Sequence, residues 1–102
     1  MNPEPALQLD RVIHERGRLA IVSVLAASPD LPFTQLRDTL EMTDGNLMTH
    51  IRTLQEAGYV SVARSYQNSR RLTTLSLTAA GRRAFAAYVS LLERIVQRTK
   101  TR

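Results

Sequence analysis

Amide, hydroxyl and guanidinium groups recur along one side of residues 44–57, together with one flexible thioether. The side chains that carry them are Asn46, Met48, Thr49, Arg52 and Thr53. Such polar groups form hydrogen bonds with base edges and phosphates in a groove of double-stranded DNA, and apolar groups can contact a thymine methyl. None of these side chains is bulky enough to hold a helix away from the groove. The set therefore predicts base reading by a recognition helix.

The ends of this helix can be predicted from single residues. Thr43 can cap the first turn with its hydroxyl, and Met42 before the cap and Leu47 after it can form a hydrophobic staple. Gly58 can close the helix in the left-handed conformation, with Tyr59 packing back as in a Schellman motif. Apolar residues at helical spacing form an inner stripe of Leu47, Ile51 and Leu54.

Residues 33–58 together predict a short helix, a tight turn and this second helix. Taken alone, the polar outer face of the second helix is better explained as ordinary solvated surface, because periodicity does not distinguish a DNA probe from a surface helix. The segment that follows favours the DNA probe over the ordinary surface helix.

Residues 59–66 and 72–77 alternate in polarity and are rich in β-branched side chains, which predicts a hairpin. Its buried face would hold Val60, Val62, Leu75 and Leu77. Two adjacent arginines near the tip can protect a sheet edge. Beside a helix-turn-helix they are better interpreted as part of a wing, about residues 64–72, that grips phosphate or enters the minor groove. The side chains expected to contact the DNA backbone are Thr34, Arg64, Asn68, Arg70 and Arg71.

The distribution of charge agrees with this assignment. The 102 residues carry a net charge of +5, but residues 1–51 hold four basic and seven acidic side chains, whereas residues 52–102 hold ten basic and two acidic ones. Thirteen of the fourteen cations are arginine, whose planar fork suits phosphate and guanine. A chain of this length fits one domain. The absence of cysteine excludes disulfides and thiolate metal sites.

The two ends of the chain are expected to lie outside the domain proper. We predict a flexible terminus at residues 1–6, the domain at residues 7–97 and a basic tail at residues 98–102. The first ten residues resemble no secretory signal, and the longest apolar stretch, near residues 19–27, is too short to span a bilayer. We therefore expect a cytoplasmic protein with no membrane partner.

Two further helices are expected to frame the motif. The first covers residues 7–27 with a bend near Gly17, and the last runs from residue 79 to about residue 97 after a cap at Thr78. The last helix either covers the domain's own core or pairs with a second copy. We favour a homodimer, because the helix offers more apolar surface than one narrow contact can use. The predicted dimer residues are Leu9, Val12, Phe85, Tyr88, Leu92 and Ile95.

Other chemistry finds little support in the residues. His14 and His50 lie on different predicted helices without further ligands at metal spacing, so we expect no metal site, and His50 is interpreted as a packing residue that forms hydrogen bonds. Serine and threonine residues fall in caps, strands and the probe helix, with no nucleophile elbow and no phosphate-cradling glycine loop. We therefore predict that the protein is not an enzyme and needs no cofactor.

Several short motifs, and the order helix, helix, turn, helix, hairpin, helix, resemble the small winged-helix regulators related to the MarR and ArsR groups. The motifs are Ile13-His14 with Arg18-Leu19, Phe33-Thr34-Gln35-Leu36-Arg37, Thr43-Asp44-Gly45-Asn46-Leu47, His50-Ile51, the run from Leu54 to Val60, and Leu77-Thr78 with Gly81-Arg82 and Ala84-Phe85. One departure is the wing tip, residues 67–69, which holds no glycine of the kind such hairpins often carry.

The resemblance implies a mainly α fold with a small β-hairpin (α+β), that is, a winged helix-turn-helix with a C-terminal dimerisation helix. It also implies a homodimeric transcriptional regulator on a pseudo-palindromic operator. A winged-helix module that binds proteins and not DNA is the alternative. An RNA binder is disfavoured, because three Tyr and two Phe offer no stacking platform. No motif identifies a small-molecule effector.

Overall fold

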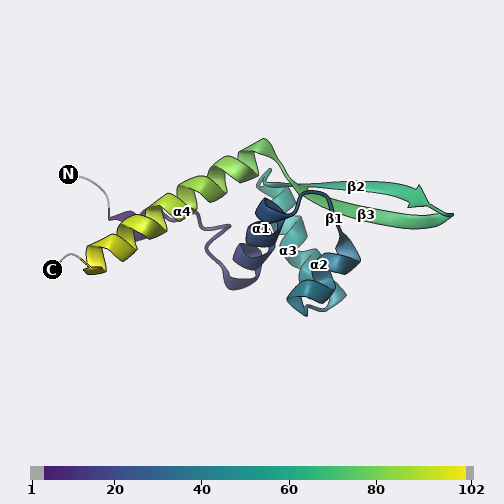
Figure 1. The fold of residues 1–102 in the computed structure, drawn as a ribbon, viewed down its shortest axis with the longest axis horizontal. Coiled ribbons are helices and arrows are strands. Elements are labelled where there is room, and N and C mark those ends of the chain that lie inside the picture. The colour runs from purple at the N-terminus through teal and green to yellow at the C-terminus, as the bar shows by residue number, and fades with distance from the viewer. Residues whose placement is uncertain (1–3, 101–102) are drawn as a thin grey trace.

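A small helical body lies between a long helix and a β-hairpin that project in opposite directions (Figure 1). The computed structural model describes residues 4–100. Their elements are η1 (Pro5–Gln8), α1 (Arg16–Ala27), β1 (Leu31–Pro32), α2 (Phe33–Leu40), α3 (Asp44–Glu56), β2 (Val60–Gln67), β3 (Arg70–Leu77) and α4 (Ala79–Lys100). The two projections give principal dimensions of 59 × 24 × 21 Å. The predicted α+β class, with helices and a hairpin, is confirmed.

The main core lies where α1, α2 and α3 meet the base of the sheet. Leu25 of α1, Leu36 of α2 and Leu75 of β3 are each inaccessible to solvent. The predicted inner stripe of α3 packs into the same cluster through Leu47, Ile51 and Leu54. Burying one such side chain stabilises the fold by about 1.5–3 kcal/mol. This packing fixes which face of α3 points inward, and so leaves the polar face outside.

Both predicted ends of α3 are confirmed. The Thr43 hydroxyl accepts a hydrogen bond from the Asn46 amide at 3.1 Å. Gly58 has a φ of +82°, and the Tyr59 amide donates to the Leu54 carbonyl at 2.9 Å, which is the Schellman geometry. The helix is therefore held at both termini by its own sequence.

The hairpin is the longer part of a three-stranded antiparallel sheet of order β1-β3-β2. Val62 pairs with Leu75, and the predicted apolar face is confirmed, with Val60, Leu75 and Leu77 buried and Val62 half-buried. Because side chains alternate between faces, Arg64 and Arg71 share the face of Val62 and Leu75. Arg70 lies on the opposite face.

The strand β1 was not predicted, because its two residues end the run Pro29-Asp30-Leu31-Pro32, which is typical of a break between helices. Leu31 pairs with Leu75 and Pro32 with Thr74. Proline is tolerated here because β1 is an edge strand, which needs no second set of amide donors. The strand ties the start of α2 to β3 and so fixes the distance between that helix and the hairpin.

The hairpin turns at Asn68 and Ser69, which have φ values of +53° and +64°. Two consecutive residues with positive φ are typical of a type I′ turn, which favours Asn-Gly. Asparagine tolerates this conformation better than serine does. We expect Ser69→Gly to raise the free energy of unfolding by about 0.5–1 kcal/mol. Chemical denaturation would measure it, and Ser65→Gly, inside strand β2, is the control expected to destabilise.

The prediction of one helix over residues 7–27 is wrong for its first half. The Asp10 carboxylate accepts hydrogen bonds from the amides of Val12 and Ile13 at 2.8 and 3.1 Å, and α1 begins only after Glu15, whose carboxylate accepts from the Arg18 amide at 2.7 Å. These side chains satisfy the backbone locally, so an irregular turn competes with a helix.

This turn and η1 pack against α4 in a second apolar cluster. Its buried members are Leu9, Ile13 and Tyr88. Leu9 and Tyr88, both predicted to be dimer residues, are only 8% and 2% exposed, so these two side chains pack inside the protomer and have almost no surface to offer a second chain. Val12, Phe85, Leu92 and Ile95 are half-buried.

The predicted outer segments only partly coincide with the described elements. Pro5–Gln8 is a short 3-10 helix that begins inside the segment expected to be flexible, residues 1–6, and α4 continues to Lys100 inside the expected tail. Arg98 pairs with Glu4 at 2.6 Å, which joins the two. Residues 1–3 and 101–102 of those segments lie outside the described residues.

Tyr59 links the end of α3 to the N-terminal turn, because its hydroxyl donates a hydrogen bond to the Asp10 carboxylate. This bond, with burial and the carboxylate charge, raises the pKa of Tyr59 to about 12, from an ordinary value of about 10. The unfolded chain therefore loses this proton first, and stability contributed by the bond is present below pH 10 and lost as the pH rises toward 12. We expect Tyr59→Phe to remove this loss. Denaturation at a series of alkaline pH values would measure it, with Tyr66→Phe, at a 74% exposed tyrosine, as control.

Candidate nucleic-acid interface

The outer face of α3 carries all five residues predicted to read bases. Asn46, Thr49 and Arg52 are exposed and Thr53 is half-buried. Met48 keeps 38% of its surface exposed, although the neighbouring Leu47 is fully buried. The structure thus brings the five together on the side of α3 opposite its buried stripe.

The free hydrogen-bonding groups on this face are unevenly distributed. The Thr49 hydroxyl donates to the Gly45 carbonyl at 2.9 Å, and the Thr53 hydroxyl donates to the Thr49 carbonyl at 3.2 Å. The side chains of Asn46 and Arg52 form no hydrogen bond or ion pair with the residues that the structure describes. An amide and a guanidinium are therefore available to an outside partner, whereas the threonine donors are engaged.

A crevice of about 170 Å³ separates this face from the hairpin. Its apolar floor includes Ile51, Val62 and Leu75, and its rim carries Arg52 from α3 and Arg64 from β2. Two guanidinium groups from different elements therefore border one hollow. A polyanion that ran along α3 would meet both of them.

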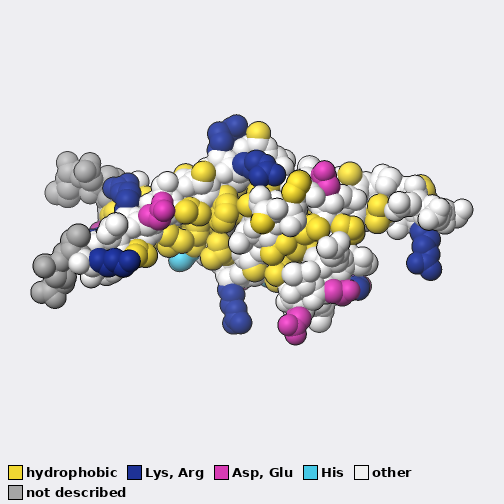
Figure 2. All heavy atoms as spheres, in the orientation of Figure 1, with side chains coloured by type: hydrophobic (Ala, Val, Ile, Leu, Met, Phe, Trp, Pro, Cys, Tyr) yellow, Lys and Arg dark blue, Asp and Glu magenta, His cyan; other side chains and the backbone are white. Residues whose placement is uncertain are grey.

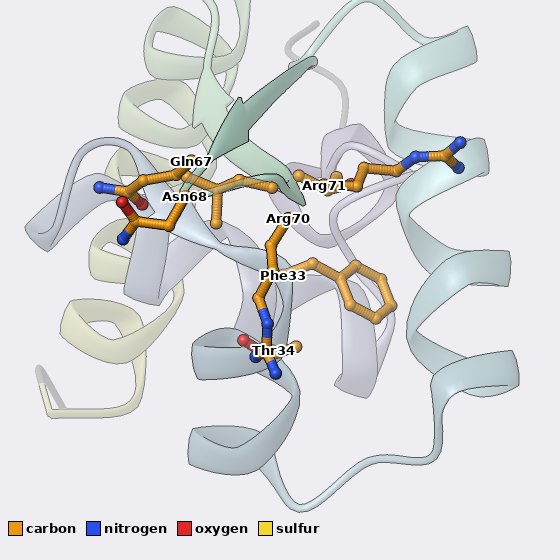
Figure 3. Close-up of a pocket in the computed structure, with 8 residues that line it drawn as sticks. Phe33, Thr34, Gln67, Asn68, Arg70 and Arg71 are labelled. Atoms are coloured by element: carbon orange, nitrogen blue, oxygen red, sulfur yellow. The ribbon is translucent and has the colours of Figure 1, made fainter.

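A second hollow, of about 390 Å³, lies between the hairpin tip and the start of α2. Figure 3 shows Arg70 pointing toward Thr34, whereas Arg71 extends to the other side of the hairpin. The N-cap of α2 is Pro32, which provides no side-chain hydrogen bond to the first turn. Thr34, at this uncapped end of α2, thus lies beside Arg70 of the wing. The structure therefore places two side chains that are predicted to contact the DNA backbone next to each other.

The guanidinium groups of the wing arginines are not neutralised by acidic side chains of the described residues. Arg64, Arg70 and Arg71 are exposed and form no ion pair with other described residues. Figure 2 shows a basic projection at the hairpin tip, away from the acidic groups on that face.

Arg37 is a positioning residue that the sequence analysis did not identify. Its guanidinium contacts the Asp44 carboxylate at 2.9 Å and the Asp38 carboxylate at 3.0 Å, and the hydrogen bonds with these two groups raise the pKa of Arg37. Arg37 therefore joins α2 to the first turn of α3 across the tight turn. The signal was an arginine and an aspartate on either side of the turn, but which partners meet depends on the angle between the helices.

His50 lies at the junction of α3 with α1. Its Nδ1 is 3.4 Å from Arg18 and 3.6 Å from the Glu15 carboxylate, and Gly17 approaches so closely that a Cβ there would be 2.6 Å from the His50 ring. The prediction of a packing residue that forms hydrogen bonds fits these contacts. His14 lies elsewhere, with its Nδ1 2.8 Å from the Tyr88 hydroxyl.

Residues 4–100 also bear on two other features, a metal site and a membrane-spanning helix. No group of three or more His, Cys, Asp or Glu side chains in this part of the chain could hold a metal ion. Within the same residues, no helix has the length and apolar character that crossing a bilayer requires.

A short helix, a turn, a second helix with an outward polar face, and a hairpin beside that face define a winged helix. The chain belongs to the winged helix DNA-binding domain family, whose model matches residues 18–96. The resemblance to small winged-helix regulators is thereby confirmed.

Three similar proteins illustrate the family and the fold. The protein MJ0432 of Methanocaldococcus jannaschii is 35% identical over 79 residues, which cover 78% of this chain and 86% of that protein. The structure of a transcriptional regulator homologue from Pyrococcus horikoshii OT3 has a TM-score of 0.82 at 27% identity, covering 86% of this chain and 87% of that chain. The structure of FabT from Streptococcus pneumoniae in complex with DNA has a TM-score of 0.65 at 22% identity, covering 92% of this chain and 69% of that chain. This last likeness concerns the fold.

Proposed function

We propose that the protein is a sequence-specific transcriptional regulator that binds double-stranded DNA as a homodimer on a pseudo-palindromic operator. The observation that carries the proposal is the placement of unpaired arginines on two elements, α3 and the hairpin, around one continuous face. In a protein whose charges served only solubility, such groups would be spread over the surface and paired with acids.

In this proposal α3, about residues 44–57, enters the major groove. The free amide of Asn46 suits adenine and the free guanidinium of Arg52 suits guanine, because each side chain can form two hydrogen bonds with that base edge. Met48, Thr49 and Thr53 complete the reading face. Base contacts of this kind discriminate between sequences, whereas phosphate contacts set position and affinity.

The wing, about residues 64–72, holds the flanking backbone or enters the minor groove. Arg64 and Arg71 lie on the face of the hairpin that is turned toward α3, and Asn68 lies at its tip. Arg70 and Thr34 border the hollow at the start of α2, where uncapped backbone amides favour a phosphate. Phosphates on both sides of the wing would thus have partners.

The dimer is proposed to form through the outer side of α4. Val89 and Val96 are 37% and 48% exposed, and with Leu92 they line a shallow hollow of about 340 Å³. Two copies joined here would set their α3 helices about 34 Å apart, the spacing of successive major grooves.

A charge on this strip should separate the subunits. We expect Val96→Glu to halve the molecular mass measured by light scattering, because a carboxylate buried in an apolar interface has no partner. Val96 is preferred to Leu92 for this test, because Leu92 also packs on the protomer's own second cluster. Ala87→Glu adds the same charge on the opposite side of α4, where Ala87 is exposed, and should leave the mass unchanged. Equal masses for all three proteins would refute this interface.

Gel-shift titration with genomic fragments at two salt concentrations tests the function itself. The proposal predicts retention that weakens steeply with salt, because each arginine that binds a phosphate releases counterions. Retention of some fragments at salt that releases the rest would establish sequence preference. The absence of salt-dependent retention would favour the protein-interaction module instead.

A further inference from the structure

The outer face of α3 offers fewer hydrogen-bond donors than its sequence suggests. The hydroxyls of Thr49 and Thr53 donate to carbonyls one turn earlier, at 2.9 and 3.2 Å. Thr49 is nevertheless exposed. With its hydroxyl turned onto the helix, the part of Thr49 that remains for an outside partner is mainly its methyl group.

Gly45, one turn before Thr49, has no structural reason to be glycine. A Cβ there would meet no atom within 4 Å, and its φ is not left-handed. Glycine weakens a helix relative to alanine. Nothing inside the protein requires residue 45 to lack a side chain. The absence of a side chain is therefore best explained by a binding partner that approaches the helix closely from outside.

Met48 extends the same surface with apolar atoms, and it is exposed although its neighbours on the inner stripe are fully buried. Gly45, Met48 and Thr49 thus form an apolar patch at the N-terminal end of α3, beside the free polar groups of Asn46 and Arg52. Recognition helices contact base edges with their N-terminal residues. In the major groove the apolar group is the 5-methyl of thymine, which threonine methyl groups contact.

We infer that this patch reads thymine methyl groups, so that each half-site contains A·T pairs beneath Gly45, Met48 and Thr49, next to the bases bound by Asn46 and Arg52. The inference rests on the proposed function, since it names the bases that the proposed reading face prefers. The Thr49 hydroxyl contributes as an acceptor only, because it donates its hydrogen bond to the Gly45 carbonyl.

The test uses duplexes selected by the full chain from a random pool. In each selected site, single thymidines are replaced by deoxyuridine, which keeps the base pair and the O4 acceptor and removes only the methyl. We expect about three- to tenfold weaker binding at one or more half-site positions. Thr49→Ser, which removes the protein methyl and keeps the hydroxyl, should reduce that penalty.

Thr99→Ser provides a matched control. Thr99 also donates its hydroxyl to a helix carbonyl, that of Val96 at 2.7 Å, but it lies at the far end of α4. Its replacement should leave the deoxyuridine penalty at the wild-type value.

The outcomes separate this inference from the proposed function. A deoxyuridine penalty that shrinks in Thr49→Ser and persists in Thr99→Ser supports the inference. Selected duplexes that bind tightly and ignore deoxyuridine, or that show the same penalty in all three proteins, overturn it and leave the function intact. Failure to select any duplex overturns both.

Discussion

Replacing Arg52 with alanine should change which DNA sequences the protein prefers, at a cost of about 1–3 kcal/mol on its best site. The guanidinium is exposed on the outer face of α3 and pairs with no acid among the described residues. Its two parallel donors suit the O6 and N7 atoms of guanine. Fluorescence anisotropy with the selected duplex and with single-base variants would measure the change. Arg52→Ala should bind the variants at the guanine position almost equally.

Arg71→Ala is the informative comparison for this variant. Arg71 lies on the hairpin, where it is expected to bind phosphate, so its loss should weaken all duplexes evenly and reduce the salt slope by about one unit. Arg94, exposed on α4 on the side away from the apolar strip, serves as a control for removing any positive charge. If Arg52→Ala and Arg71→Ala behaved alike in both preference and slope, the division between reading helix and wing would be contradicted.

Gly81→Ala should destabilise the fold by about 3 kcal/mol or more. A Cβ on Gly81 would lie 2.2 Å from the carbonyl oxygen of Tyr59, which is a backbone atom and cannot rotate away. That carbonyl also accepts a hydrogen bond from the Thr78 amide at 3.0 Å. The substitution therefore forces α4 away from the chain that connects α3 to the hairpin, and we expect both stability and DNA binding to fall.

Gly45→Ala is the matched control for Gly81→Ala. Its added methyl would meet no atom within 4 Å, so the free energy of unfolding should stay equal or rise by about 0.5–1 kcal/mol. Urea denaturation of the two variants would measure both values. Equal stabilities for the two would contradict the close packing of α4 on Tyr59.

Local sequence patterns were sufficient to predict the structure where one or two neighbouring residues decide it. Thr43 and Gly58 fixed the ends of α3, and the alternation of Val60 and Val62 with Leu75 and Leu77 fixed the face of the hairpin that packs inward. The outward face of α3 followed from these, and the residues that we propose for base reading lie on it.

Prediction from the sequence failed where packing against residues distant in the chain decides the local structure. Leu9 and Ile13 have helical spacing, but they fill the cluster under Tyr88. The carboxylates of Asp10 and Glu15 hold the segment before α1 in an irregular turn. Local periodicity cannot reveal this, because the alternative to a helix is stabilised by residues of α4 some 75 positions away. The same holds for β1, which exists only because β3 offers it a partner.

The contacts of Arg37 show a third kind of limit. Its two aspartates were visible in the sequence, yet Asp44 could equally have capped its own helix or faced solvent. The angle between α2 and α3, set by Leu36 and Leu47 in the core, decides that their charges meet. Ion-pair partners therefore depended on tertiary geometry even inside a motif whose elements were predicted correctly.

The most direct test of the central claim is to titrate the protein with a selected duplex and follow its backbone amides by NMR. The account predicts the largest chemical-shift changes in two stretches, residues 45–53 of α3 and residues 64–71 of the hairpin, with smaller changes at the start of α2. Changes confined to α4, or none at all when duplex is in excess, would contradict the assignment of this face to DNA.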